Sequence, residues 1–441
     1  MLRRYRIAFM VNEPKFPLDE VGDSSNLFAL ALLSFVVGAF AGLVASAFRL
    51  LLRSADDWRA VVIAQAHPWG WLGLSLVVGG VALVAALAAW LVFRVAPQAS
   101  GSGIPHVEQQ FQGGSSGEPL SIIAVKFFGG VLAIGGGFAL GREGPTVQMG
   151  GSIGQLIGRA FRRTPNECRV LLAAGAGAGL ATAFNAPIAG AVFVLEELVG
   201  SFDIAVTVAT LGASASAIAV SRVFFGQSPD FHVPVSGFVE FGDLPVSMLF
   251  GIAMGFVGVI YNRIILAALK LSASFSHLHG TVRAGAIGAS VGLIGWFAPS
   301  LIGGGDNLTQ QALDAQGSLA AVASTLALRF LLGPLCYAAR TPGGLFAPMI
   351  TIGSQAGFVF FLLWSHLLAF TAALPQQFAI VGMASIFAAV VRAPVTGIIL
   401  AVELTGSFSL FLPLLGATFA AAATARLLKD PPIYESLRRV H

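Results

Sequence analysis

The chain has 441 residues, of which 56% are hydrophobic and only 10% are charged, and its mean hydropathy is +0.83. This composition excludes a water-soluble globular protein, which needs far more charge on its surface. The net charge of +4 is too small for a nucleic-acid-binding arm, and the 2 cysteines and 7 histidines form neither a disulfide framework nor a metal-spaced cluster. We therefore expect an integral membrane protein with no metal, no cofactor and no nucleic-acid partner.

The N-terminal segment 1–24 carries charges throughout and lacks the apolar core of a signal peptide. Beyond it, apolar runs near the length of a membrane span recur. They cover residues 27–48, 70–93, 204–220, 246–260, 319–328, 353–374 and 408–425. Between these runs lie shorter apolar pieces, broken by glycine and proline, which we expect to be too short to cross a bilayer of about 30 Å alone.

Clustered arginines predict how the chain is oriented in the membrane. They are Arg3, Arg4 and Arg6 at the start, Arg159, Arg162 and Arg163 in an inner loop, and Arg438 and Arg439 at the end. By the positive-inside rule these places face the cytoplasm. We expect a multi-pass protein of the cell (inner) membrane with both termini cytoplasmic.

Two pairs of segments reveal an internal repeat. NAPIAGAVFVLEE (185–197) aligns without a gap with RAPVTGIILAVEL (392–404), and GPTVQMGGSIG (144–154) aligns with APMITIGSQAG (347–357). The offsets, 394 − 187 = 207 and 348 − 145 = 203, differ by only a small gap. If each half has an odd number of crossings, the halves are inverted, and such repeats commonly build a substrate site at their interface from discontinuous helices.

The repeat predicts the domain organisation. We expect a first membrane repeat at 25–225, a connecting segment at 226–245, and a second membrane repeat at 246–441 whose last helix faces the cytoplasm. No cytoplasmic regulatory domain is expected, since the chain ends shortly after its last motif.

Four motifs place glycine or proline directly before an apolar stretch. They are GSGIP (101–105), GREGP (141–145), GGLFAP (343–348) and DPPIY (430–434). Proline tolerates the first helical turn and glycine permits close backbone approach, so each motif predicts a helix start. Helix N-termini buried in a membrane expose unpaired N–H groups and a positive dipole end, and several that converge would form an anion site.

These motifs, in this order and over the whole chain, resemble the CLC family of chloride channels and chloride/proton exchangers. The resemblance implies an all-α membrane fold with two inverted repeats of tilted and broken helices, a homodimeric assembly, and a pathway in each subunit. It implies a transporter rather than an enzyme. Absence of paired nucleotide-binding modules makes the chain similar to the prokaryotic, exchanger-type members.

The resemblance also assigns roles to particular residues. Chloride would be held by the hydroxyls of Ser102 and Tyr434 and by the backbone N–H groups of Leu345 and Phe346. Glu143 would be the gating glutamate. Its physics can be argued independently, because a carboxylate that faces an anion site can fill the site when ionised and must leave it when protonated.

Arg142 and Glu143 lie side by side in an otherwise apolar run. A charge at membrane depth costs roughly 2.5–3.5 kcal/mol or more, so it is functional or paired by default. The simpler interpretation is that the two side chains neutralise each other in a solvated loop. The flanking motifs favour a functional Glu143, and they leave Arg142 a structural or electrostatic role near the outer entrance.

The pair Glu196 and Glu197 lies at the end of an apolar helix. By resemblance to the exchangers, Glu197 would transfer protons from the cytoplasmic side, whereas channel members usually have a non-acidic residue there. For Glu196, whose repeat partner is Glu403, we expect a structural role. The sequence thus predicts a chloride/proton antiporter, and the alternative is a passive, gated chloride channel in which Glu143 only gates.

Other polar residues near the first motif have simpler interpretations. Glu108 and His106 are expected to make buried contacts, with Lys126 as a candidate partner. An intramembrane hydrolase with Ser102 as nucleophile and His106 as base is the hypothesis from another class. It leaves the remaining motifs without a role.

Overall fold

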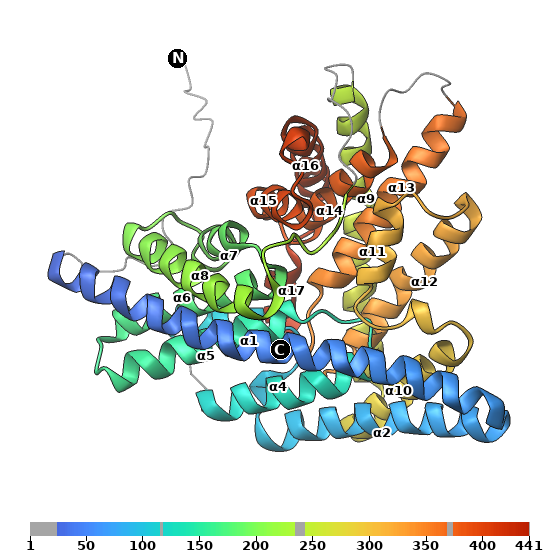
Figure 1. The fold of residues 1–441 in the computed structure, drawn as a ribbon, viewed down its shortest axis with the longest axis horizontal. Helices are drawn as coiled ribbons and strands as arrows, with labels where there is room; N and C mark the ends of the chain where they lie inside the picture. Colours follow the sequence, from blue (N-terminus) through green and yellow to red (C-terminus); the bar gives the residue numbers. More distant parts are fainter. Residues whose placement is uncertain (1–23, 115–117, 234–242, 368–373, 441) are drawn as a thin grey trace, which may run out of the picture.

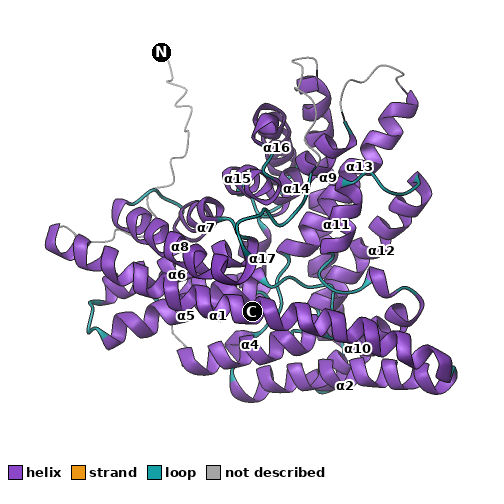
Figure 2. Cartoon of the chain, in the orientation of Figure 1, coloured by secondary structure: helices purple, strands orange, loops and turns teal. Residues whose placement is uncertain are grey.

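The computed structural model describes residues 24–114, 118–233, 243–367 and 374–440. The predicted N-terminal segment lies almost entirely outside this range, as does much of the predicted connecting segment. The described part consists of helices joined by loops and turns, and it contains no strand (Figure 2). The predicted all-α fold is therefore confirmed.

The helices fall into two series of eight in the described part, followed by a final short helix. The first series comprises α1 (Ser24–Ala66), α2 (Trp71–Val95), α3 (Ile104–Phe111), α4 (Pro119–Gly135), α5 (Glu143–Ala160), α6 (Pro165–Phe184), α7 (Pro187–Phe193) and α8 (Ile204–Phe225). The second comprises α9 (Asp243–Ser274), α10 (Gly280–Phe297), α11 (Asp306–Leu313), α12 (Leu319–Tyr337), α13 (Phe346–Leu367), α14 (Pro375–Val390), α15 (Pro394–Thr405) and α16 (Phe411–Leu427), and the chain ends with α17 (Ile433–Val440).

Short helical turns join some of these helices. The 3₁₀ turns are η1 (His67–Trp69), η2 (Pro97–Ala99), η4 (Pro299–Leu301) and η5 (Phe408–Leu410), and a π-helical turn, η3 (Val194–Val199), follows α7. All four motifs that predicted helix starts lead into helices, namely α3, α5, α13 and α17. The glycine and proline chemistry at each motif is the physical reason.

Among the described residues, 8 helices are long and apolar enough to cross a membrane. They are α1, α2, α6, α8, α9, α12, α13 and α16. Each predicted apolar run falls on one of them, although the last residues of the run 353–374 lie outside the described part. Only α6, among these 8 helices, was not predicted as a span, because we expected its region to contain only short apolar pieces. Its alanine- and glycine-rich window is 89% buried, so neighbouring helices, and not lipid, surround most of it.

The two series repeat the same packing. The helix α5 packs on α6 as α13 packs on α14, and α1 packs on α8 as α9 packs on α16. Across the repeats, α2 packs on α10 and α7 on α15. Figure 1 shows α2 beside α10 at one side of the molecule and α14, α15 and α16 gathered at another. The predicted pair of repeats is present in the three-dimensional structure.

Reciprocal helix caps show how the repeats are related. The Glu196 carboxylate, one turn beyond α7, accepts from Val395 N (3.1 Å) and Thr396 N (2.7 Å) at the start of α15. In return Glu403, near the end of α15, accepts from the N–H groups that open α7 (3.1 and 2.7 Å). The equivalent helices α7 and α15 thus lie antiparallel, as inversion of one repeat relative to the other requires. The structural role expected for Glu196 is this cap.

Candidate anion site at converging helix starts

Backbone hydrogen bonds join the three glycine-rich loops that precede α3, α5 and α13. Gly343 N donates to Gly101 O (3.0 Å), while Gly141 and Gly344 exchange two hydrogen bonds between their N–H and C=O groups (2.8 and 2.7 Å). Two of these loops come from the first repeat and one from the second. The junction holds three helix N-termini close together, where backbone dipoles favour a negative charge.

Ser102 is fully buried at the start of α3. Its Oγ accepts from Ile104 N (3.3 Å), which leaves the hydroxyl proton available for another acceptor. Gly144, in the first turn of α5, packs so closely that a Cβ there would lie 2.6 Å from Ser102 O. The starts of α3 and α5 are therefore in direct contact, and only glycine fits at this position.

Glu143 is the first residue of α5 and is 1% exposed. Its Oε2 accepts a hydrogen bond from Ala347 N in the first turn of α13, with an N–O distance of 3.4 Å. The same oxygen lies against Gly141, where any side chain would collide with it. The carboxylate therefore sits at the N-terminus of a helix from the other repeat, in the electrostatic environment that suits an anion.

Leu345 and Phe346 are fully buried where α13 begins. Among the described residues, their backbone N–H groups make no hydrogen bond. The Tyr434 ring stacks on the Phe346 ring, with centroids 6.2 Å apart, and Tyr434 lies near Ser102 and Glu143. Its buried hydroxyl has no hydrogen-bond partner within the described part of the chain. Unpaired buried donors are costly, so these groups fit an anion as their acceptor.

Tyr337, the last residue of α12, is a site residue that the sequence reasoning missed. It is buried, its hydroxyl accepts from Ser102 N (3.4 Å), and it lies near Tyr434. Its own hydroxyl proton has no acceptor among the described residues. The available signal was a tyrosine a few residues before GGLFAP, at the end of a predicted span.

Glu197 lies on the π-helical turn η3, beside Glu196, and is half-buried. It lies near Tyr434. The two adjacent carboxylates therefore have different surroundings. Glu196 caps α15, whereas Glu197 lies near a residue of the candidate site. Single π-helical turns inside helices occur frequently at functional sites.

Glu108 is buried and paired, as expected, but its ion pair is with a residue other than the candidate partner Lys126. Glu108 forms an ion pair with Arg438 of α17 (2.9 Å), and Lys126 Nζ instead donates to the backbone of Gly101 (2.7 Å). The reason is that α17 folds back onto α3 and brings an arginine to the acidic residue. Lys126 thus holds the first glycine motif in place through a hydrogen bond to the carbonyl oxygen of Gly101.

His106 does not make the contact with Ser102 that the hydrolase hypothesis requires. Its Nδ1 contacts the Gln148 amide (3.0 Å), and no hydrogen bond between His106 and Ser102 occurs in the described structure. The Ser102 hydroxyl is used as a helix-start acceptor. The nucleophile and base that this hypothesis needs are therefore not paired.

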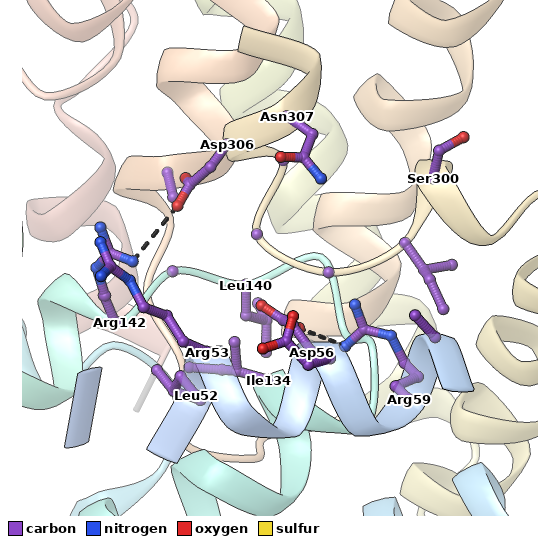
Figure 3. A pocket seen from close by; sticks show the side chains of 18 of the residues that line it. Leu52, Arg53, Asp56, Arg59, Ile134, Leu140, Arg142, Ser300, Asp306 and Asn307 are labelled. Carbon is purple, nitrogen blue, oxygen red and sulfur yellow. Dashed lines mark hydrogen bonds and ion pairs between the residues drawn. The ribbon is translucent and has the colours of Figure 1, made fainter. Parts of the chain in front are cut away.

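A cavity of about 590 Å³ has Glu143 in its lining. Figure 3 shows the pocket with other lining side chains, among them Arg142 and Asp306, labelled. Its charged lining comprises Arg53, Asp56, Asp57, Arg59, Arg142, Glu143 and Asp306. The Asp306 side chain is 54% exposed and that of Asp56 is 48% exposed, so the cavity leads from the buried carboxylate to the surface. It offers a polar route for ions or protons to the glutamate.

Arg142 pairs with aspartates from two other segments. Its guanidinium contacts Asp230 (3.3 Å) and Asp306 (3.4 Å), the latter drawn in Figure 3. Asp230 is also paired with Arg49 of α1 (2.5 Å). Arg142 is therefore anchored by these partners, and the interpretation in which it neutralises Glu143 is not the arrangement found.

The fold and the site together define a multi-pass, all-helical membrane protein whose two inverted repeats bring buried helix N-termini to a common point. The sequence profile described as voltage gated chloride channel matches residues 84–426. The chain belongs to this family, the CLC family, as its motifs predicted.

Individual relatives are similar over nearly the whole chain. The H⁺/Cl⁻ exchange transporter ClcA of Vibrio cholerae serotype O1 (strain M66-2) is 36% identical, over 98% of this chain and 94% of its own length. The ClcA transporter of Vibrio campbellii is also 36% identical, over 99% and 96%. The crystal structure of a slow cyanobacterial Cl⁻/H⁺ antiporter has a TM-score of 0.88 at 33% identity, covering 93% of this chain and 97% of that one.

A more distant solved structure shares the fold alone. The structure of a eukaryotic CLC transporter has a TM-score of 0.76 at 21% identity, and the match covers 93% of this chain and 74% of that one. Together these comparisons confirm the predicted CLC fold with inverted repeats.

Proposed function

We propose that the protein is a chloride/proton antiporter, in which Glu143 is both the gate and the proton acceptor. The observation that carries this proposal is the hydrogen bond from Ala347 N to the Glu143 carboxylate. A carboxylate held at the start of α13 competes with chloride for the same helix N-terminus. Protonation removes its charge and lets the anion replace it, so one group links the two fluxes.

Ser102, Leu345, Phe346 and Tyr434 are the proposed chloride-binding residues. Support comes from the unpaired N–H groups at the start of α13 and the unpartnered Tyr434 hydroxyl. Neutral hydroxyl and amide donors attract an anion and still let it leave, which suits a transport pathway. Chloride as the substrate is supported by the exchange transporters that the chain resembles over nearly its full length.

Glu197 is the proposed internal proton-transfer residue. Its half-buried position and its proximity to Tyr434 support this role, because a half-buried carboxylate near a proposed anion-binding residue can exchange protons with both solvent and the site. A channel needs no such residue, so Glu197 distinguishes the antiporter from the passive gated channel.

We further propose a homodimer with a separate pathway in each subunit, since all the proposed site residues belong to one chain. The proposed location is the inner membrane with both termini cytoplasmic, supported by the arginine clusters. The proposed division into repeats at 25–225 and 246–441 is supported by the end of α8 at Phe225 and the start of α9 at Asp243. Light scattering in detergent tests the homodimer, and labelling of single cysteines introduced near each terminus in sealed vesicles tests the orientation.

The decisive experiment uses purified protein in liposomes. An outward chloride gradient should drive protons uphill into the vesicles, with reciprocal chloride movement under a pH gradient. Glu197→Gln should abolish proton movement while chloride flux continues, whereas the exposed control Glu118→Gln should behave as wild type. Chloride flux without any proton movement in the wild-type protein would establish the channel and overturn the proposal.

A further inference from the structure

A second cavity, of about 320 Å³, lies where α3 and α5 end and α6 begins. We call it the arginine pocket. Its lining includes Arg159, Arg163 and Arg169 together with Gln110 and Gln155. None of these residues belongs to the proposed chloride pathway. No carboxylate lines the pocket within the described part of the chain, so its lining carries an excess of positive charge.

Several polar groups of this lining have no partner in the described structure. Gln110 is only 6% exposed, and its Nε2 is buried without a hydrogen bond. The buried Nε of Arg163 is a second donor without a partner, whereas the unpaired Oε1 of Gln155 is an acceptor. An unsatisfied buried donor typically costs about 1–3 kcal/mol, so Gln110 Nε2 and Arg163 Nε indicate a ligand that supplies acceptors.

Arg169 provides the clearest unpaired charge of the pocket. Within the described residues its guanidinium makes no hydrogen bond or ion pair. It lies against Gly113, where a Cβ would come within 2.8 Å of Arg169 Nη2. Arg163, by contrast, contacts Glu167 (3.7 Å), so part of its charge is already compensated. Because Gly113 has no side chain, the Arg169 guanidinium fits against it, and both residues line the cavity.

We propose that the arginine pocket binds a phosphate group. A phosphate carries at least one full negative charge and presents several acceptor oxygens, which match the forked N–H groups of guanidinium. The Gln110 amide adds a neutral donor to the set. A single halide ion could not satisfy donors spread over three helices around a cavity of about 320 Å³.

The phosphate can come from two sources. Basic pockets between helix ends at a membrane surface bind lipid headgroups, and the clustered arginines fit the anionic leaflet. Free inorganic phosphate has the same chemistry. Both are bound by the same side chains, and they differ in whether acyl chains accompany the group.

The test measures binding directly and is independent of transport. Purified full-length protein, saturated with chloride to occupy the pathway, is titrated with inorganic phosphate by calorimetry. In parallel, nanodiscs of phosphatidylcholine with or without phosphatidylglycerol are compared by native mass spectrometry for retained lipid. Binding of phosphate alone indicates the free anion, and selective retention of phosphatidylglycerol indicates the headgroup.

The matched variants are Arg169→Gln, Arg169→Lys and the control Arg162→Gln. We expect Arg169→Gln to weaken binding by about tenfold or more, since a charge-assisted hydrogen bond is lost, and Arg169→Lys to restore part of the affinity. Arg162 is exposed, lies in the loop between α5 and α6 and does not line the pocket, so its variant should bind as wild type. Arg169 has no hydrogen bond or ion pair with any other described residue, so its variants should keep the wild-type unfolding temperature.

Three results would overturn the proposal. The first is a wild-type protein that does not bind phosphate and does not retain phosphatidylglycerol in preference to phosphatidylcholine. The second is equal binding by the wild type and Arg169→Gln, and the third is an equal loss of binding in Arg162→Gln. Either of the last two would mean that binding reflects general surface charge.

Discussion

Replacing Glu143 by glutamine tests the competition between a carboxylate and an anion at the start of α13. In the structure the Glu143 Oε2 accepts from Ala347 N and lies at a helix N-terminus. Glutamine keeps the size and one acceptor oxygen but removes the charge. A hydrogen bond to a charged group contributes about 1.5–3 kcal/mol and a neutral one about 0.5–1.5 kcal/mol. The helix dipole adds about 0.3–1 kcal/mol for a nearby anion.

In the variant the side chain at position 143 therefore binds at Ala347 N more weakly by about 1–3 kcal/mol. Chloride, which competes for the same place, should bind roughly 5- to 150-fold more tightly. Calorimetric titration of chloride into protein prepared in a large organic anion measures this change. In liposomes the same variant should pass chloride and move no protons. Glu118→Gln, which removes an exposed carboxylate at the start of α4, should change neither property. Unaltered chloride affinity combined with intact proton pumping in Glu143→Gln would refute the reasoning.

Three further substitutions probe the site and its support. Tyr434→Phe should weaken chloride binding several-fold, since a donor is lost. It should not lower the unfolding temperature in chloride-free buffer, because the hydroxyl has no hydrogen-bond partner in the described part of the chain. A destabilised variant with normal affinity contradicts this. Gly144→Ala should destabilise the protein by about 1–3 kcal/mol through the clash with Ser102 O, seen as a lower unfolding temperature in detergent, and an unchanged temperature would show that the α3–α5 contact yields easily. Glu403→Ala should cost about 0.5–2 kcal/mol by removing the cap of α7, and full wild-type stability would mean that water replaces it.

The sequence predicted the elements whose chemistry is local. Glycine and proline at GSGIP, GREGP, GGLFAP and DPPIY specify helix starts wherever the chain folds, and all four begin helices. The long apolar runs predicted spans for the same reason. The helix α6 was missed because hydropathy reports contact with lipid, and a helix surrounded by protein has no need of large apolar side chains.

Contacts between distant segments were beyond the sequence reasoning. Glu108 and Arg438 lie far apart along the chain and meet only because α17 packs on α3. The approach of Tyr337 to Ser102 N likewise depends on where α12 ends relative to the first motif. The order of the motifs identified the candidate site residues. The hydrogen bond from Ala347 N to Glu143 could be found only in the three-dimensional structure.

The backbone bonds that join Gly101 to Gly343 and Gly141 to Gly344 also bear on biogenesis. A ribosome finishes the first repeat long before it reaches the second, so a newly inserted first half holds Ser102 and Glu143 without the loop that completes their surroundings. The candidate anion site can therefore form only after the second repeat has been made. Expressed separately, neither half should bind chloride, and recovery of binding when both halves are produced together would report that the two have docked.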